Sequence, residues 1–256
     1  EIHKKYYRLS DKVSTQVTLA SIRHSMDTTD AFYEKEKAYY DEQVPAYSNL
    51  SVEYLKLLYH SLYREELEQI IGPVAFKNME LSFRSVSEAV IPLMQEENAL
   101  VTEYEKLLAS AKIDWDGETL NLSLLGPYLK HKDPEVRRKA YEKQNAFFMS
   151  IEDKLDELYD KLVKNRTLQA KELGFETYTK LGYLRMQRNS YRREQVENLR
   201  RQVKEVFVPF AESLYEQRRK RLGLSKMYFS DEQVYGTKES SAFWYTGRDS
   251  GSRTEN

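Results

Sequence analysis

Cysteine is missing from this chain of 256 residues. Without it, neither a disulfide framework nor a zinc site built from thiolates can form. A chain free of cysteine is compatible with a reducing compartment, and we therefore expect the protein to be cytoplasmic.

Histidine is almost as rare, with four residues in the whole sequence, namely His3, His24, His60 and His131. No two of them stand four positions apart. The zinc-binding pattern H-E-x-x-H, which places two imidazoles on adjacent turns of one helix, is therefore absent. We predict no catalytic residue and no metal ligand within this chain.

Glycine and proline are also scarce, with 9 and 6 residues, whereas charged residues make up 32% of the chain. Glycine and proline are the residues that most disfavour a helix, so their low number favours long helices with solvated charged faces. No apolar run approaches the roughly 20 residues that a membrane-spanning helix needs. The composition predicts a soluble helical protein without a membrane partner.

Apolar residues recur at intervals of three and four over most of the chain, a spacing typical of helices. Val44-Pro45, Gly72-Pro73 and Gly174 are the predicted breaks, because proline and glycine disfavour continuation of a helix. Pro209 is a predicted kink. The predicted helices cover about residues 4–23, 31–44, 49–70, 74–83, 89–108, 134–172, 178–186 and 192–222.

One segment has the alternation of a strand pair instead. Residues 112–115 and 118–122 alternate apolar and polar side chains, and Asp116-Gly117 between them suits a two-residue turn with positive φ. Two strands alone are marginal in water, so this ribbon must pack on helices. The predicted fold class is all-α, mainly long helices, with one small β-hairpin near residues 112–122.

Charge is distributed unevenly along the chain. Residues 25–110 contain 16 acidic and 7 basic residues, and residues 178–226 contain 13 basic and 5 acidic residues. The basic residues recur at helical spacing and alternate with glutamates, as on a helix face held by ion pairs. We therefore predict no nucleic-acid partner, although a basic segment of this kind can bind one.

Three further groups could carry chemistry, and we assign each a structural origin. His24, Asp27 and Asp30 could meet at one metal ion, but D-T-T-D at 27–30 has the composition of a helix cap. Glu96 and Glu97 are adjacent, so they should point to different helix faces and not form an acid–base pair. The glycosylation sequon at 165–167 is predicted to lie within a helix, as a chance match.

Several segments resemble, in order and spacing, the amino-terminal half of oligoendopeptidase F, a branch of the thimet-oligopeptidase-like zinc metallopeptidases. They are IRHSMDTTDAFY at 22–33, QEEN at 95–98, the hairpin region 107–127, the stretch 153–175 and LGYLRMQR at 181–188. The similarity extends from about Leu9 to Tyr228.

The resemblance implies the helical half of a clamshell-shaped zinc oligopeptidase that hydrolyses internal bonds of short peptides. In that family the zinc ligands and the general base belong to the carboxy-terminal half. The expected partners are therefore short peptide substrates and a missing catalytic half. Zinc is expected in the complete enzyme and not in this chain, which we predict to be inactive alone.

Two predictions about organisation follow. Residues 1–231 form the helical amino-terminal part, and residues 232–256 form an atypical tail, disordered or truncated.

The alternative function, from a different class, is a non-catalytic helical scaffold or peptide-binding module.

The segment from Leu181 to Tyr191 holds the candidate site. Tyr183, Arg185, Arg188 and Tyr191 carry polar tips that could line a substrate channel and hold a carbonyl or carboxylate group. Leu181, Leu184 and Met186 are predicted to be core residues. The structural alternative is that the arginines stabilise a junction between helices with their long stems.

Overall fold

The structure, a computed structural model, describes residues 2–234. Most of the predicted tail, residues 235–256, lies outside the described residues. The chain divides into two compact units. Among the described residues, unit 1 comprises 2–110 and 151–192, and unit 2 comprises 111–150 and 193–234.

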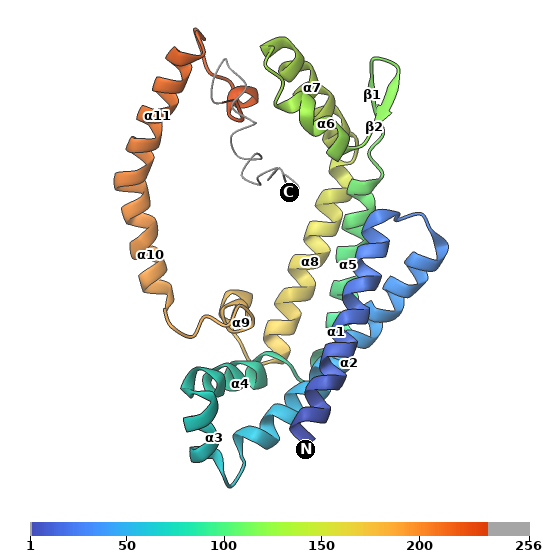
Figure 1. The fold of residues 1–256 in the computed structure, drawn as a ribbon, viewed down its shortest axis with the longest axis vertical. Coiled ribbons are helices and arrows are strands. Elements are labelled where there is room, and N and C mark those ends of the chain that lie inside the picture. The colour runs from blue at the N-terminus through green and yellow to red at the C-terminus, as the bar shows by residue number, and fades with distance from the viewer. Residues whose placement is uncertain (1, 235–256) are drawn as a thin grey trace, which may run out of the picture. The chain divides into compact units, whose positions relative to one another are not determined.

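Unit 1 is helical (Figure 1). Helix α1 packs against α2, α2 packs against α4 and α5, and α5 packs along α8. The elements are α1 (Ile2–Met26), α2 (Ala31–Tyr59), α3 (Arg64–Ile71), α4 (Pro73–Ser85), the 3₁₀ turn η1 (Glu88–Val90), α5 (Ile91–Ala109), α8 (Glu152–Glu172) and α9 (Tyr178–Arg185). Buried apolar side chains of this unit include Ala20, Val52, Phe76, Val90, Leu100, Leu158 and Leu181.

Helix α2 continues through Pro45, so the break predicted at Val44-Pro45 is wrong. Proline has no N–H and leaves the carbonyl of Asp41, four residues earlier, without its helical donor. The side-chain amide of Asn98 on α5 donates to that carbonyl at 2.9 Å. A neighbouring helix thus supplies the hydrogen bond that proline removes, and α2 stays intact.

A single helix over residues 49–70 is also wrong, because α2 ends at Tyr59 and α3 begins at Arg64. Ser61 holds the intervening turn. Its hydroxyl accepts the Tyr63 N–H at 3.2 Å, and its carbonyl accepts the Arg64 N–H at 3.1 Å. Serine competes in this way with helical hydrogen bonding, which explains the interruption.

Unit 2 combines a hairpin with helices. Its elements are β1 (Ile113–Trp115), β2 (Glu118–Leu120), α6 (Leu122–Leu129), α7 (Pro134–Ser150), α10 (Arg193–Gln202), the π-helical turn η2 (Val203–Phe207), α11 (Val208–Arg221) and the 3₁₀ turn η3 (Phe229–Asp231). Helix α6 is not among the helices predicted from the sequence. Its signal was Asn121, whose side chain accepts the Leu124 N–H at 2.8 Å as a helix cap.

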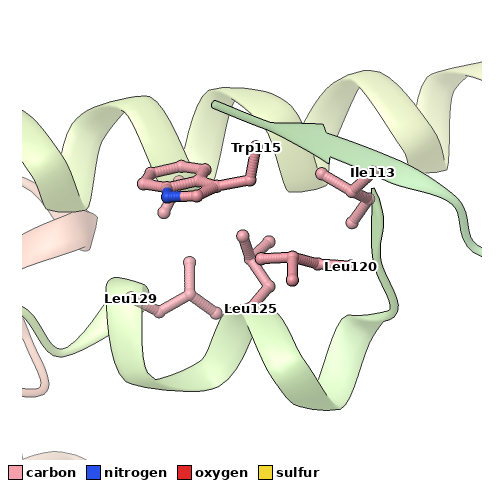
Figure 2. Close-up of a cluster of buried hydrophobic side chains, with 6 residues drawn as sticks. Ile113, Trp115, Leu120, Leu125 and Leu129 are labelled. Atoms are coloured by element: carbon pink, nitrogen blue, oxygen red, sulfur yellow. The ribbon is translucent and has the colours of Figure 1, made fainter. Parts of the chain in front are cut away.

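The predicted hairpin is confirmed, with antiparallel pairing of Ile113 with Leu120. Asp116 and Gly117 form the turn, with φ of 51° and 91°. Figure 2 shows that the strands lie on helices, as expected for so small a ribbon. The core consists of Ile113, Trp115 and Leu120 from the hairpin, Leu125 and Leu129 from α6, and Ala140 from α7. Burying a large apolar side chain stabilises by about 1.5–3 kcal/mol, so this cluster fixes the hairpin on the two helices.

The helix predicted over 134–172 is interrupted at Ile151, where α7 ends and α8 begins. The Ser150 hydroxyl donates to the Phe147 carbonyl at 2.6 Å. That carbonyl is the one that the Ile151 N–H would use in a continuous helix. Serine back-bonding of this kind bends or interrupts helices.

The predicted kink at Pro209 takes the form of the π-helical turn η2 directly before it. The Val208 N–H bonds to the Val203 carbonyl, five residues earlier. Proline next in sequence cannot donate, and a π turn is one way in which a helix adjusts to such a gap. None of the helices between residues 2 and 234 combines the length and apolar character needed to cross a bilayer.

Candidate functional site

The candidate segment begins on α9 and turns back over its end. The Gln187 N–H bonds to the Leu184 carbonyl at 2.8 Å, and the Arg188 N–H bonds to the Tyr183 carbonyl at 3.1 Å. These two bonds define a Schellman motif, in which the residue after the helix cap adopts a left-handed conformation. Gln187 is that residue, with φ of 51°. The motif folds Arg188 back toward Tyr183.

Arg188 lies near two tyrosine rings. Its guanidinium carbon is 4.4 Å from the ring centre of Tyr183 and 5.6 Å from that of Tyr191. Both distances are within the range of cation–π attraction. Within residues 2–234, the guanidinium of Arg188 makes neither a hydrogen bond nor an ion pair. Three of the four predicted site residues therefore come together, with the donors of Arg188 unused.

Arg185, the fourth candidate, points into unit 1 instead. Its guanidinium donates to the Gln169 side-chain oxygen at 2.6 Å and to the Ser85 carbonyl at 3.4 Å. It also lies 3.7 Å from a Glu97 carboxylate oxygen. These partners belong to α8, α4 and α5, so Arg185 joins α9 to three other helices.

Gln169 is the centre of this polar network and is completely buried. Its side-chain amide donates to Glu97 at 2.8 Å and to the Asn165 oxygen at 2.6 Å, while its own oxygen accepts from Arg185. Arg166 donates to the other Glu97 oxygen at 2.7 Å. Burial acts to lower the pKa of Arg166, but the hydrogen bond and the charge of Glu97 raise it above its usual value.

The prediction that Glu96 and Glu97 point to different helix faces is wrong. Both accept hydrogen bonds from α8, Glu96 from Asn165 at 2.7 Å and Glu97 from Arg166 and Gln169. Both glutamates accept hydrogen bonds that join α5 to α8, in agreement with the structural role assigned to them from the sequence. The signal for this network was the spacing of Asn165 and Gln169, two polar residues four apart within an otherwise apolar stripe.

The predicted burial of the apolar residues in this segment is confirmed for Leu181 and wrong for Met186. Leu181 is fully buried, with 0% exposure, as predicted for the core. Met186 is 55% exposed, so its assignment to the core is wrong. Its position as the C-cap of α9, directly before the left-handed residue Gln187, directs it outward. Asn165, in the sequon, is 3% exposed within α8, so its predicted place inside a helix is confirmed.

The residues that the structure describes do not fit a zinc site. Asp27 binds the Thr29 N–H at 2.8 Å and hydroxyl at 2.7 Å, and Asp30 caps α2, as predicted. His24 is buried, and its Nε2 has no hydrogen-bond partner among the described residues. Over residues 2–234, no group of three or more histidine, aspartate or glutamate side chains is arranged to hold a metal ion.

Two protein-family models match the chain. The model described as the Peptidase M3 N-terminal domain matches residues 1–86, and the model described as Peptidase family M3 matches residues 127–243. Together they cover well over half of the sequence. No match was found among curated proteins.

Three solved structures have a similar fold. A protein provisionally named oligoendopeptidase F matches with a TM-score of 0.89 at 39% identity, over 92% of this chain and 42% of its own. A protein provisionally named oligoendopeptidase F from Bacillus anthracis strain Ames matches with a TM-score of 0.82 at 41% identity, over 86% of this chain and 40% of its own. PZ peptidase A with an inhibitor matches with a TM-score of 0.86 at 38% identity, over 90% of this chain and 41% of its own. The chain spans about two fifths of the length of these relatives.

Proposed function

The chain belongs to peptidase family M3, and on this basis we propose that it forms the amino-terminal part of a zinc-dependent oligopeptidase acting on short peptides. The observation that carries the proposal is the joint agreement of sequence and fold with proteins named oligoendopeptidase F, over nearly the whole chain. Hydrolysis of internal peptide bonds is the proposed reaction. A cytoplasmic location is compatible with a chain that lacks cysteine.

The zinc of this oligopeptidase would be held by residues outside this sequence. Zinc in a peptidase needs three protein ligands, typically two histidines and a carboxylate, with one position left for water. The four histidines here lack the spacing for that site. Chemistry at the metal is therefore proposed for the complete protein alone, and this chain contributes binding and architecture.

An exposed apolar helix face supports the proposal that a further domain packs against this part of the protein. Helices α10 and α11 and the turn η2 contain no buried residue. Four large apolar side chains on them are 59–63% exposed, namely Leu199, Val206, Phe207 and Phe210. Contiguous apolar exposure of this kind marks an interaction surface. The proposed cover is the carboxy-terminal catalytic part that the longer relatives possess.

The segment Tyr183–Tyr191 is the proposed substrate-contact region of this part. Tyr183, Arg188 and Tyr191 form a mixed aromatic and cationic surface, suited to peptide side chains and to backbone or terminal carbonyl groups. Arg185 supports the region from within, since its donors are engaged by Gln169 and Ser85.

The decisive experiment compares the complete natural protein that carries this sequence with the 256-residue chain alone. The complete protein should retain stoichiometric zinc after dialysis and cleave a quenched fluorescent peptide at an internal bond, and a chelator should abolish the cleavage. The isolated chain should do neither. Chelator-sensitive turnover by the isolated chain, or a complete protein without peptidase activity, would contradict the proposal. The second outcome would favour a non-catalytic scaffold or peptide-binding module.

A further inference from the structure

We propose that Arg188 is a carboxylate receptor, which makes the enzyme prefer peptides that present a carboxylate to the segment Tyr183–Tyr191. This inference rests on the proposed function and adds a substrate class to it. Its basis is an arginine that is fixed in position on two aromatic rings while its hydrogen-bond donors stay unused.

The position of Arg188 is set by the backbone. The hydrogen bond of its N–H to the Tyr183 carbonyl, at 3.1 Å, anchors the residue at the end of α9. Further contacts hold the segment that follows. The Asn189 carbonyl accepts from the Lys77 ammonium, and the Asn189 side-chain amide donates to the Asn78 side-chain oxygen, both on α4. The backbone of Arg188 therefore has a defined position in unit 1.

The side chain is held as well as the backbone. The guanidinium lies 4.4 Å from the Tyr183 ring centre and 5.6 Å from the Tyr191 ring centre, and the residue is half-buried. A guanidinium that rests on an aromatic ring keeps its N–H edge free, because the rings contact its face. Two rings thereby restrict the rotamers of a long side chain before any ligand arrives.

The donors of Arg188 remain available. A guanidinium has five N–H donors in a planar fork that matches a carboxylate bidentately. In the described part of the chain, those of Arg188 meet no acceptor and no carboxylate. Arg185, three residues earlier, shows the contrast, because Gln169, Ser85 and Glu97 surround it. Of the two arginines, only Arg188 can accept an anion without first losing an internal partner.

A carboxylate is the anion that a short peptide brings. It can come from the carboxy terminus or from an aspartate or glutamate side chain. The chemistry is the same in both cases, so substrates must separate the two sources. If Arg188 only stabilised the fold through its two tyrosine contacts, the enzyme would show no preference for either source of carboxylate.

The test uses the complete protein with three quenched fluorescent peptides of one core sequence. The first ends in a free carboxylate, the second in an amide, and the third in an amide but with one aspartate. Arg188→Gln should lower kcat/KM for the carboxylate peptides by about 10- to 100-fold, the range expected for a hydrogen bond to a charged group. The amide peptide without aspartate should change by less than about threefold, because no charged bond is lost. The peptide that loses most identifies the source of the carboxylate.

Matched variants control for charge and folding. Lys180→Gln removes a cation from α9, the helix that precedes Arg188, and should leave all three peptides unchanged because Lys180 is exposed and paired with Glu176. Arg188→Lys keeps the charge without the planar fork and should give an intermediate loss. Circular dichroism melting verifies that each variant is folded. Equal losses for all three peptides, or no loss with any, would overturn the carboxylate assignment.

A failure of the proposed function can be recognised separately. If the complete protein cleaves no peptide, Kd values for the same three peptides, from fluorescence anisotropy, still test Arg188. Tighter binding of carboxylate peptides that Arg188→Gln abolishes would support the receptor. Equal affinity for all three peptides would overturn it.

Discussion

Asn98 on α5 donates its side-chain amide to the Asp41 carbonyl on α2 at 2.9 Å, in place of the N–H that Pro45 lacks. One turn away, Gln95 donates to the Glu42 carbonyl at 2.7 Å. The QEEN segment that resembles oligoendopeptidase F thus has a structural explanation at both ends. Its outer residues bond to the backbone of α2, and its two glutamates bond to α8.

Asn98→Ala should destabilise α2 around Pro45. The Asp41 carbonyl would lose the Asn98 donor while half-buried, which costs about 1–3 kcal/mol. Native-state hydrogen exchange of the α2 amides measures the loss. Asn145→Ala removes an exposed asparagine from α7 and serves as the control, with no expected change in α2.

A second background tests the cause of that loss. In Pro45→Ala, residue 45 regains an N–H that can bond to the Asp41 carbonyl. Asn98→Ala should therefore cost less in the Pro45→Ala background than in the natural sequence. An equal cost in both backgrounds would show that Asn98 stabilises through packing and not through the freed carbonyl.

Gln169→Leu should be among the most destabilising substitutions in unit 1. It removes one hydrogen-bond partner from each of Arg185, Asn165 and Glu97, which are buried or half-buried. An unpaired buried polar group costs about 1–3 kcal/mol, and more if it is charged. Thermal unfolding followed by circular dichroism should show a clearly lower Tm. The same replacement at the exposed Gln16 on α1 should leave Tm nearly unchanged.

The local elements of the fold could be predicted from the sequence because their causes are local. Asp116-Gly117 forms its turn with positive φ, and Gly72 and Gly174 end helices with φ of 88° and 77°. Pro45 and Ser150 gave wrong boundaries. Proline should have ended α2, but a donor on Asn98, 57 residues from Asp41 in the chain, replaced its hydrogen bond. A hydrogen bond of this kind cannot be seen in a local pattern.

The candidate site was predicted as a segment but not residue by residue. Arg185 and Arg188 have the same side chain and are equally polar in sequence. Arg185 differs because Gln169 and Ser85 lie against it, 16 and 100 residues away in the chain. The left-handed conformation of Gln187 could not be predicted from the sequence, since glycine is the usual residue at that position. The different surroundings of the two arginines are therefore a result of tertiary packing.

Asp231→Ala should strongly destabilise the contact of η3 with α7 in unit 2. The Asp231 carboxylate pairs with Arg137, and both side chains are nearly inaccessible, at 4% and 2% exposure. Removing one partner of a buried pair costs about 3–5 kcal/mol, because the other charge stays buried without compensation. Hydrogen exchange of the α7 amides gives the measurement.

The double variant Arg137→Met with Asp231→Leu separates pairing from burial. Two apolar side chains of similar volume often replace a buried ion pair at little cost. The Arg137 guanidinium also donates to the carbonyls of His131 at 2.7 Å and Lys132 at 3.0 Å, so some loss should remain. We expect a smaller destabilisation than for Asp231→Ala. A larger one would mean that these carbonyl contacts outweigh the ion pair.

Gln187→Gly should leave unit 1 as stable as before or stabilise it. Gln187 has φ of 51°, and a left-handed conformation costs a residue with a Cβ about 1–2 kcal/mol relative to glycine. Glycine partly offsets that gain through its greater freedom in the unfolded chain, about 0.4–1 kcal/mol. The matched control is Gly174, which ends α8 in the same motif with φ of 77°, and where a Cβ would lie in open space with respect to the described residues. Gly174→Gln should therefore lower the free energy of unfolding through backbone strain alone. Urea unfolding measures the change in the free energy of unfolding for both variants. A lower free energy of unfolding in Gln187→Gly would show that the glutamine side chain stabilises the turn before Arg188.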